Sequence, residues 1–415
     1  MKVRHTYRLR PGVTAQRYLA REWGMCRYVW NQLVAQSKSR RATNPDATFG
    51  YADQDKFLTH LRATTTHDEV AWLAAGSSVA QQQTVRDFAA ARTKALKDRK
   101  ARLPMSQRRG LPRFKKRDVA LASINYTSRG FTLKTDATGR VRLVLPGGVH
   151  IPVVWSRDLP SHPKSVRVHQ DRLGHWYASF VVDVEHEHMP TAGDHVALGL
   201  DWGVAETATT VRVDLATGAV DETTRFDLPH KQHGRRAAAE LASAQRQMAR
   251  RRRPKGTAQS HGYRLAKHHA AKVAKKVARQ RKDDAHKWAK TLVGAHDQIA
   301  VEDFRPKFLA KSTMARKAAD AAIAATKAAL IWQATKAGRQ VVLVHPSHTT
   351  TDCGNCGART KHRLPLGERT YTCESCGKVR PRDKNSATVM VARAGFCPAD
   401  VEGVRPDPTQ WVQAA

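Results

Sequence analysis

The spacing of hydrophobic and polar residues predicts one strand and then several helices in the first quarter of the chain. Residues 2–9 alternate loosely between the two kinds, which favours a strand, and Pro11-Gly12 then favours a turn. From Thr14 the apolar residues recur every three or four positions, which is the helical period. Two further helices are predicted near residues 53–64 and 77–96, the second with a serine cap. The first 96 residues therefore predict a strand followed by a small helical domain.

Residues 130–185 show the period of two that is typical of half-exposed strands. Gly139 and Gly174 each end a short polar turn between two such runs, as in a β-hairpin. This pattern predicts an antiparallel sheet or a small barrel, which the opening strand could join with the helices inserted between. The predicted strands are 131–134, 141–145, 166–169 and 176–184.

After residue 195 the apolar runs become more continuous, which is typical of strands that are buried on both faces. Helices are predicted around 313–337 and 385–394, and the tail from residue 398 is predicted to be disordered or loosely attached. Strands and helices in this mixed order predict an α/β core. The predicted strands of this part are 196–200, 207–213, 223–227, 298–304 and 340–345.

The net charge of the chain indicates the kind of partner that it binds. The 415 residues include 72 Lys and Arg against 36 Asp and Glu, a formal charge of +36, which favours binding to a polyanion. Residues 97–117 hold ten basic residues and one acid, and residues 231–290 hold 19 against three in a predicted helical hairpin. A solvated surface explains many charge runs, but runs of one sign favour contact with nucleic acid. The candidate contacts are Arg113, Lys115, Lys116, Arg250, Arg251, Arg252, Arg253 and Lys255.

The sequence has the features of a protein that stays inside the cell. It contains no apolar run of 18 residues, so neither a membrane span nor a membrane partner is predicted. Its first residues lack the apolar segment of a signal peptide. We therefore expect an intracellular protein located in the cytoplasm.

Four of the six cysteines have the spacing of a metal site. Cys353 and Cys356 form one Cys-x-x-Cys pair, and Cys373 and Cys376 form a second pair after 16 intervening residues. In a reducing compartment such pairs bind metal instead of forming disulfides. Four thiolates close a tetrahedron around one structural Zn²⁺. Cys26 and Cys397 are expected to be ordinary buried or half-buried residues.

Acidic residues at the ends of apolar runs are the candidates for catalysis. Asp201 ends one run, Glu302 and Asp303 end another, and Asp383 opens a helical segment. Each alone is more typical of a turn or a cap. Three together on an α/β scaffold, beside basic segments, predict two Mg²⁺ ions that cleave nucleic acid. Neighbouring strand residues face opposite ways, so this pattern leaves both Glu302 and Asp303 open.

A resemblance extends this prediction. Leu-Gly-Leu-Asp-Trp-Gly, Ile-Ala-Val-Glu-Asp-Phe and Arg-Asp-Lys-Asn-Ser-Ala resemble the three motifs of a split RuvC nuclease domain; they occupy 198–203, 299–304 and 382–387. The paired cysteines just before the third motif resemble the zinc ribbon of the TnpB family and of the miniature type V CRISPR effectors. Segments 26–31, 110–116 and 280–287 also resemble TnpB, so the similarity runs from about residue 1 to 394. Two departures are Trp202, which is bulkier than usual, and Asn-Ser-Ala-Thr-Val-Met at 385–390, where the family usually has Asn-Ala-Ala-x-Asn-Ile.

The resemblance implies a multidomain fold of α/β and β-barrel type. An N-terminal wedge β-barrel is split by a helical recognition domain, and an RNase H-like (RuvC) nuclease domain with an inserted zinc ribbon follows. The implied parts are the first wedge strand at 1–13, the recognition domain at 14–110, the rest of the wedge barrel at 111–192, the RuvC domain at 193–348 with its basic hairpin at 231–290, the zinc ribbon at 349–380, the last RuvC motif at 381–397 and a tail at 398–415.

The resemblance also implies an RNA-guided DNA endonuclease. Such a protein binds a guide RNA, recognises a short motif beside a double-stranded target, displaces one strand and cleaves the DNA. Asp201, Glu302 and Asp383 would bind two catalytic Mg²⁺ ions, and the protein would act as a monomer or as a homodimer on one RNA. The alternatives are a guide-RNA-bound DNA-binding protein that represses without cleavage and a DNA-strand transferase.

Overall fold

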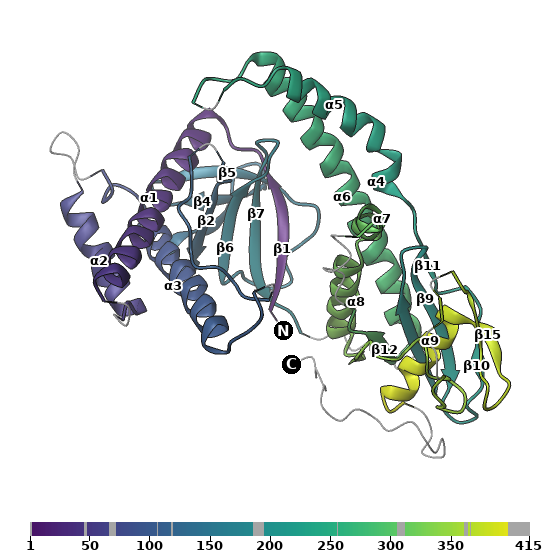
Figure 1. Ribbon diagram of the computed structural model, residues 1–415. Coiled ribbons are helices and arrows are strands. Elements are labelled where there is room, and N and C mark those ends of the chain that lie inside the picture. The colour runs from purple at the N-terminus through teal and green to yellow at the C-terminus, as the bar shows by residue number, and fades with distance from the viewer. Residues whose placement is uncertain are drawn as a thin grey trace. The chain divides into compact units, whose positions relative to one another are not determined.

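The chain divides into two compact units, residues 1–184 and 185–415. The computed structural model describes residues 2–44, 48–65, 72–105, 107–117, 119–185, 195–254, 256–304, 312–360, 364–365 and 367–396 (Figure 1). Each unit has its own sheet and its own helices. None of the helices in these ranges is both long and apolar enough to span a membrane.

The first unit contains an antiparallel sheet of seven strands in the order β2-β6-β7-β1-β5-β4-β3. The opening strand β1 pairs with β7 over most of its length and with β5 at its end, so the prediction that it joins the later hairpins is confirmed. The pairings place β2 and β3 at the two ends of the sheet, and its closure into a barrel stays a prediction. The strands are β1 Lys2–Leu9, β2 Ser123–Thr127, β3 Thr132–Thr135, β4 Val141–Leu145, β5 Val149–Val154, β6 Ser165–Gln170 and β7 Trp176–Asp183.

Three helices are inserted between β1 and β2, namely α1 Val13–Thr43, α2 Tyr51–Thr64 and α3 Ser78–Lys100. The apolar stripe of α1 serves two hydrophobic cores. Leu19 and Cys26 pack with the sheet, whereas Val29 and Leu33 pack with α2 and α3. The Ser77 side chain caps α3 by accepting from the Ala80 amide. The sequence pattern therefore predicted both the position of α1 and its buried face.

The second unit contains a mixed sheet in the order β10-β9-β8-β12-β13, with β11 also paired to β9. Strands β8, β12 and β13 are parallel neighbours, and β9 is antiparallel to β8. Parallel strands end at the same edge of a sheet, so the carboxyl ends of β8 and β12 lie together. The strands are β8 Val196–Trp202, β9 Glu206–Asp214, β10 Val220–Asp221, β11 Leu228–Pro229, β12 Gln298–Glu302 and β13 Gln340–Val344.

Helices cover both faces of this sheet (Figure 1). The carboxyl-terminal half of α6 (His261–Ala295) and α8 (Ile323–Ala337) pack on one face through a core that includes Trp288 and Leu330. Helix α9 (Arg382–Arg393) packs on the other face through Met390 and Val391. The remaining elements are α4 His233–Arg236, α5 Ala238–Arg250, α7 Ala315–Ala321 and two ribbon strands, β14 Thr370–Thr372 and β15 Val379–Pro381.

Two predicted elements of this unit are wrong. The segment 223–227 is not a strand, because its Asp227 carboxylate accepts from the Thr210 amide and the Lys384 ammonium where a strand would pair through its backbone. The helix predicted at 313–337 is broken at Ala322, which has the left-handed φ of 53° and separates α7 from α8. The predicted tail from 398 lies outside the described residues.

The contact between β8 and α9 requires a glycine. A Cβ added to Gly199 would overlap the carbonyl oxygen of Ala387 and lie 2.7 Å from Cγ2 of Val391. We expect Gly199→Ala to destabilise the protein by roughly 1–3 kcal/mol, because overpacking forces the helix away from the strand. Thermal or urea unfolding measures this loss. The matched control is Gly294→Ala, at an exposed helical position with no atom within 4 Å of the added Cβ. That change should be stabilising by up to about 1 kcal/mol, and equal effects of the two would contradict the prediction.

Candidate metal centres and nucleic-acid surfaces

Two acidic side chains, Asp201 and Glu302, lie together at the carboxyl edge of the second sheet, and the charge of a third acid, Asp383, acts on Asp201. Asp201 is the second-last residue of β8, Glu302 is the last residue of β12, and Asp383 is in the first turn of α9. Asp201 and Glu302 are only 9% and 6% exposed, whereas the Asp383 side chain is 40% exposed. The fold therefore gathers acids that are about 100 and 80 residues apart in the sequence.

The pKa shifts of these acids reflect their burial and their proximity. Burial, with the charges of Glu302 and Asp383, raises the pKa of Asp201 well above its usual range. Burial also raises the pKa of Glu302, to about 7. Two buried carboxylates that are unstable as anions favour a cation among them, and an all-oxygen donor set suits a hard ion such as Mg²⁺.

Packing distinguishes Glu302 from Asp303, which the strand pattern left equivalent. Asp303 Oδ1 accepts from the Lys327 ammonium at 2.7 Å, and its backbone amide donates to the Val344 carbonyl at 2.7 Å. Glu302 instead interacts with the Asp201 side chain. Adjacent residues at a strand end point to opposite sides, so only one of this pair can face Asp201. The geometry favours Glu302 as the metal-facing acid.

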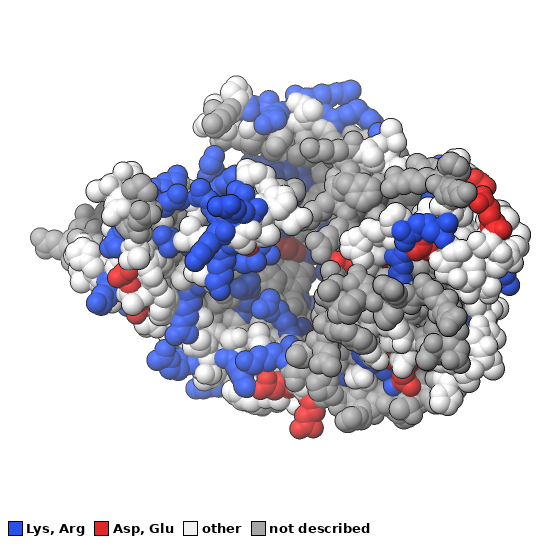
Figure 2. Space-filling model, turned by 60° about the horizontal axis from the view of Figure 1, so that its bottom comes forward, with Lys and Arg blue, Asp and Glu red and all other residues white. Residues whose placement is uncertain are grey.

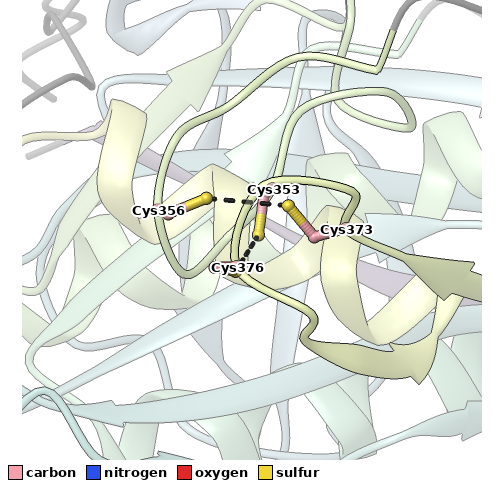
Figure 3. Close-up of side chains that lie close together, drawn as sticks. All are labelled: Cys353, Cys356, Cys373 and Cys376. Carbon is pink, nitrogen blue, oxygen red and sulfur yellow. Dashed lines mark hydrogen bonds between the residues drawn. The ribbon is translucent and has the colours of Figure 1, made fainter.

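The four paired cysteines form a compact cluster (Figure 3). Their sulfurs all lie within 4.8 Å of one another, with 3.8 Å between those of Cys353 and Cys376 and 3.6 Å between those of Cys356 and Cys373. A tetrahedron of sulfurs each ~2.3 Å from a zinc ion has edges of about 3.8 Å, so the residues fit that ion. The three carboxylates are not gathered this tightly, and no second group of this kind occurs in the described part of the chain.

Each cysteine pair lies on the same kind of turn. The Gly357 amide donates to the Cys353 carbonyl at 3.0 Å, and the Gly377 amide donates to the Cys373 carbonyl at 2.9 Å. Both glycines have the left-handed φ that these turns require, 72° and 68°. The backbone amide of Lys378 lowers the pKa of the Cys376 thiol to about 6, whereas burial raises the pKa of the Cys353 and Cys356 thiols. The case for metal therefore rests on the sulfur spacing, since a bound cation stabilises thiolates.

The cysteine cluster is joined to the helix that carries Asp383. The Gly354 amide donates to Asn385 Oδ1 at 3.0 Å, and Asn385 Nδ2 donates to the Asp352 carbonyl at 2.7 Å. An added Cβ on Gly354 would lie 2.7 Å from Cβ of Thr388, so the first turn packs directly on α9. Sequence reasoning missed this role of Asn385, because nothing near it in the chain indicates its partners.

The predicted basic contacts have different surroundings. Lys115 is half-buried, with its ammonium over the Trp30 ring at 3.7 Å and near the Trp23 ring at 5.3 Å. Asn31 accepts from the Lys115 amide at 2.8 Å and donates to its carbonyl at 3.2 Å. Lys115 therefore docks its segment on α1, a role that differs from the predicted phosphate contact. Arg113 and Lys116 are exposed.

The four arginines at the end of α5 are also exposed. Two of them close the loop that follows, since Arg251 donates to the Gly262 carbonyl at 3.3 Å and Arg253 donates to the Ala258 carbonyl at 3.2 Å. Lys255 lies outside the described residues. Lys and Arg outnumber Asp and Glu on the face shown in Figure 2, which is the distribution expected of a surface that attracts phosphates.

Comparison with known families gives three partial matches. A model described as "Cas12f1-like, TNB domain" matches residues 325–390, one described as "Probable transposase" matches 179–313, and one described as "Helix-turn-helix domain" matches 1–45. In this chain the last of these regions is the strand β1 and the single 31-residue helix α1.

Relatives match the chain over nearly its whole length. The "Putative RNA-guided DNA endonuclease" of Streptomyces pristinaespiralis is 29% identical over 404 residues, which are 96% of this chain and 91% of the relative. The "Putative RNA-guided DNA endonuclease InsQ" of Escherichia coli (strain K12) is 27% identical over 432 residues, with 98% of each chain covered. A shorter stretch of 123 residues is 31% identical to the "TnpB-like protein L79" of Acanthamoeba polyphaga mimivirus, and covers 28% of this chain and 23% of that one. The chain is thus similar to TnpB-like proteins.

A solved structure is similar to this TnpB-like chain in fold. It is titled "Cryo-EM structure of the Cas12f1-sgRNA-target DNA complex", with a TM-score of 0.51, 12% identity and coverage of 94% of this chain and 98% of that one. At this identity the likeness concerns the fold alone, which is mixed α/β in both units of our chain.

Proposed function

We propose that this TnpB-like protein is an RNA-guided DNA endonuclease and that Asp201, Glu302 and Asp383 form its catalytic site. The observation that carries the proposal is the burial of Asp201 and Glu302 at one sheet edge, with Asp383 close enough for its charge to act on Asp201. Burying two carboxylates together lowers the stability of the fold. Such an arrangement is typical of functional sites, where the acids bind cations that serve catalysis. The long alignments with relatives that bear this name add support.

The three acids would hold two Mg²⁺ ions. Held there, the cations would supply activation of the attacking water and stabilisation of the leaving oxygen. The ends of β8 and β12 hold Asp201 and Glu302 rigidly, and the more exposed Asp383 leaves one side open to DNA. Burial raises the pKa of Glu302 to about 7, so a cation held there would favour loss of the Glu302 proton.

The partners of this activity would be a guide RNA and a double-stranded target DNA with one displaced strand. The excess of 36 positive charges supports tight phosphate binding. We propose that the seven-stranded sheet is the wedge barrel, that α1–α3 are the recognition domain, and that the second unit is the RuvC domain. The cysteine cluster would bind one structural Zn²⁺, which fits its sulfur spacing.

Neither alternative function named in the sequence analysis accounts for both the buried acids and the implied guide-binding regions. A repressor that binds DNA without cleaving it has no use for two buried acids. A strand transferase would use the acids but not the guide-binding regions that the resemblance implies.

A programmed cleavage assay tests the proposal. The protein is purified with its copurifying RNA, that RNA is sequenced, and its guide segment is matched to a plasmid library with randomised flanking bases. We expect cleavage that needs Mg²⁺, a matched target and one short flanking motif, and that stops with EDTA. Specific binding of the matched plasmid without any cleavage would support the repressor alternative and overturn this proposal.

A further inference from the structure

The residue that directly follows each of the three acids is anchored to another element. These residues are Trp202, Asp303 and Lys384, with side chains that are buried or nearly so. We propose that they are positioning residues, each of which fixes the acid before it within the metal site. This inference rests on the proposed function, because it concerns the same three acids.

Lys384 is the most completely bonded of the three. Its side chain is 8% exposed, and its ammonium donates to the Thr210 carbonyl at 2.8 Å, the Thr223 carbonyl at 3.2 Å and the Asp227 carboxylate at 2.9 Å. Asp227 in turn accepts from the Thr210 amide at 2.6 Å. The first turn of α9 is thereby fixed to β9 at Thr210.

This attachment bears directly on the distance between two of the acids. Thr210 is the pairing partner of Leu200 on β8, and Leu200 precedes Asp201. A short path of bonds therefore connects Asp383 to Asp201 through Lys384 and Thr210. The charges of Lys384 and Asp227 cancel, so the pair offers no net attraction or repulsion to a cation and its effect on the site is geometric.

Trp202 connects the backbone beside Asp201 to the backbone of Glu302. Its indole N–H donates to the backbone carbonyl of Glu302 at 3.1 Å, just beyond the last ladder pair between β8 and β12, Leu200 and Val301. Its ring packs against Trp288, with centroids 6.1 Å apart. The bulk that distinguishes Trp202 from the usual family residue is what spans this gap.

Asp303 fixes the end of β12 from the opposite side. Its bonds to Lys327 on α8 and to the Val344 carbonyl on β13 hold the backbone where Glu302 emerges. For Trp202 and Asp303, which follow acids at strand ends, the anchoring has a simple geometric reason. Successive side chains point to opposite faces, so when an acid faces the open edge its neighbour faces protein and can bond there.

Mn²⁺ binding to the full-length, zinc-loaded protein without nucleic acid tests the inference. The loss of the free-ion electron paramagnetic resonance signal measures affinity, and melting temperature measures stability. We expect Lys384→Met to weaken Mn²⁺ binding about tenfold or more, as loss of a residue supporting metal ligands does. Trp202→Phe keeps an aromatic ring but removes both the indole N–H donor to Glu302 and the ring bulk that spans the gap. It should weaken binding severalfold and, like the Val273→Ala control below, lower the melting temperature modestly.

Two controls separate positioning from general stability. Val273→Ala removes buried methyl groups from α6 and should lower the melting temperature without changing Mn²⁺ affinity. Lys56→Met, at an exposed position on α2, should change neither. Wild-type Mn²⁺ affinity in a folded Trp202→Phe variant would overturn the inference, even if Lys384→Met fails to fold.

The outcome also distinguishes this inference from the proposed function. If wild type binds Mn²⁺ through Asp201 and the variants weaken that binding, the inference stands even where no guide RNA supports cleavage. If wild type cleaves its target and the variants bind Mn²⁺ normally, only the inference falls. If wild type binds no Mn²⁺ at the acids, both fall.

Discussion

Asp201→Asn should abolish cleavage of a matched DNA, by about a thousandfold or more, while guide RNA and target binding stay near the wild-type level. The change keeps the shape of the side chain and removes the charge that holds the cations, so the loss falls on chemistry and not on recognition. Cleavage of a labelled linear target under single-turnover conditions measures the first effect. Gel-shift titration measures the second.

The same substitution should stabilise the metal-free protein at high pH. Burial and the neighbouring acids raise the folded-state pKa of Asp201, whereas an unfolded aspartate ionises near pH 4. The stability that this group contributes is therefore complete below about pH 4 and is lost as the pH rises towards its folded pKa. Asparagine has no such loss, so the gain in melting temperature should be larger at pH 8 than at pH 5.

Asp214→Asn is the matched control for both effects. This aspartate lies on β9 opposite Val196, at the other end of β8 from Asp201. Its pKa is lowered by the Thr217 backbone amide, so its anion is already stable in the fold. The control should cleave normally and should not gain stability with rising pH. Equal cleavage by wild type and Asp201→Asn would show that the site has been misassigned.

Cys373→Ser should remove the bound zinc and much of the ribbon's structure together. Cys373 is buried, and a hydroxyl in its place leaves three ligands for an ion that needs four in a structural site. Because binding energy of a structural zinc is folding energy, melting temperature and soluble yield should fall with the metal content. Cleavage should fall too, since the first cysteine turn packs on α9, which carries Asp383.

Metal analysis of the purified protein measures the first effect, with one zinc per chain expected for wild type and none for the variant. Cys26→Ser is the control, because Cys26 is equally buried but lies in the first unit, outside the cluster. It should keep its zinc whatever its stability. Wild-type protein that contains no zinc, or a variant that keeps it, would remove the zinc assignment.

The cysteine site could be predicted from the sequence more completely than the acidic site. The cysteine cluster was complete in the sequence, because each pair is local and the glycines that shape its turns stand beside it. The acids were candidates only, since a strand end that carries Asp201 looks the same whether the residue is a cap or a ligand. Lys384 could not be assigned any role, because its partner Asp227 is 157 residues away in the chain.

The sequence by itself determined the period of α1, the continuous strands of the second sheet, the two cysteine turns and the strong positive charge. These depend on residues that are near one another in the chain or on composition alone. The strand pattern left Glu302 and Asp303 equivalent, and the resemblance alone favoured Glu302. Tertiary structure shows that Asp303 bonds to Lys327 while Glu302 faces Asp201. It also decided that Lys115 docks on tryptophans, that 223–227 is a turn around Asp227, and that Gly199 admits α9. Each of these depends on packing between segments that are far apart in the chain. The residues around one partner therefore do not indicate where the other partner lies.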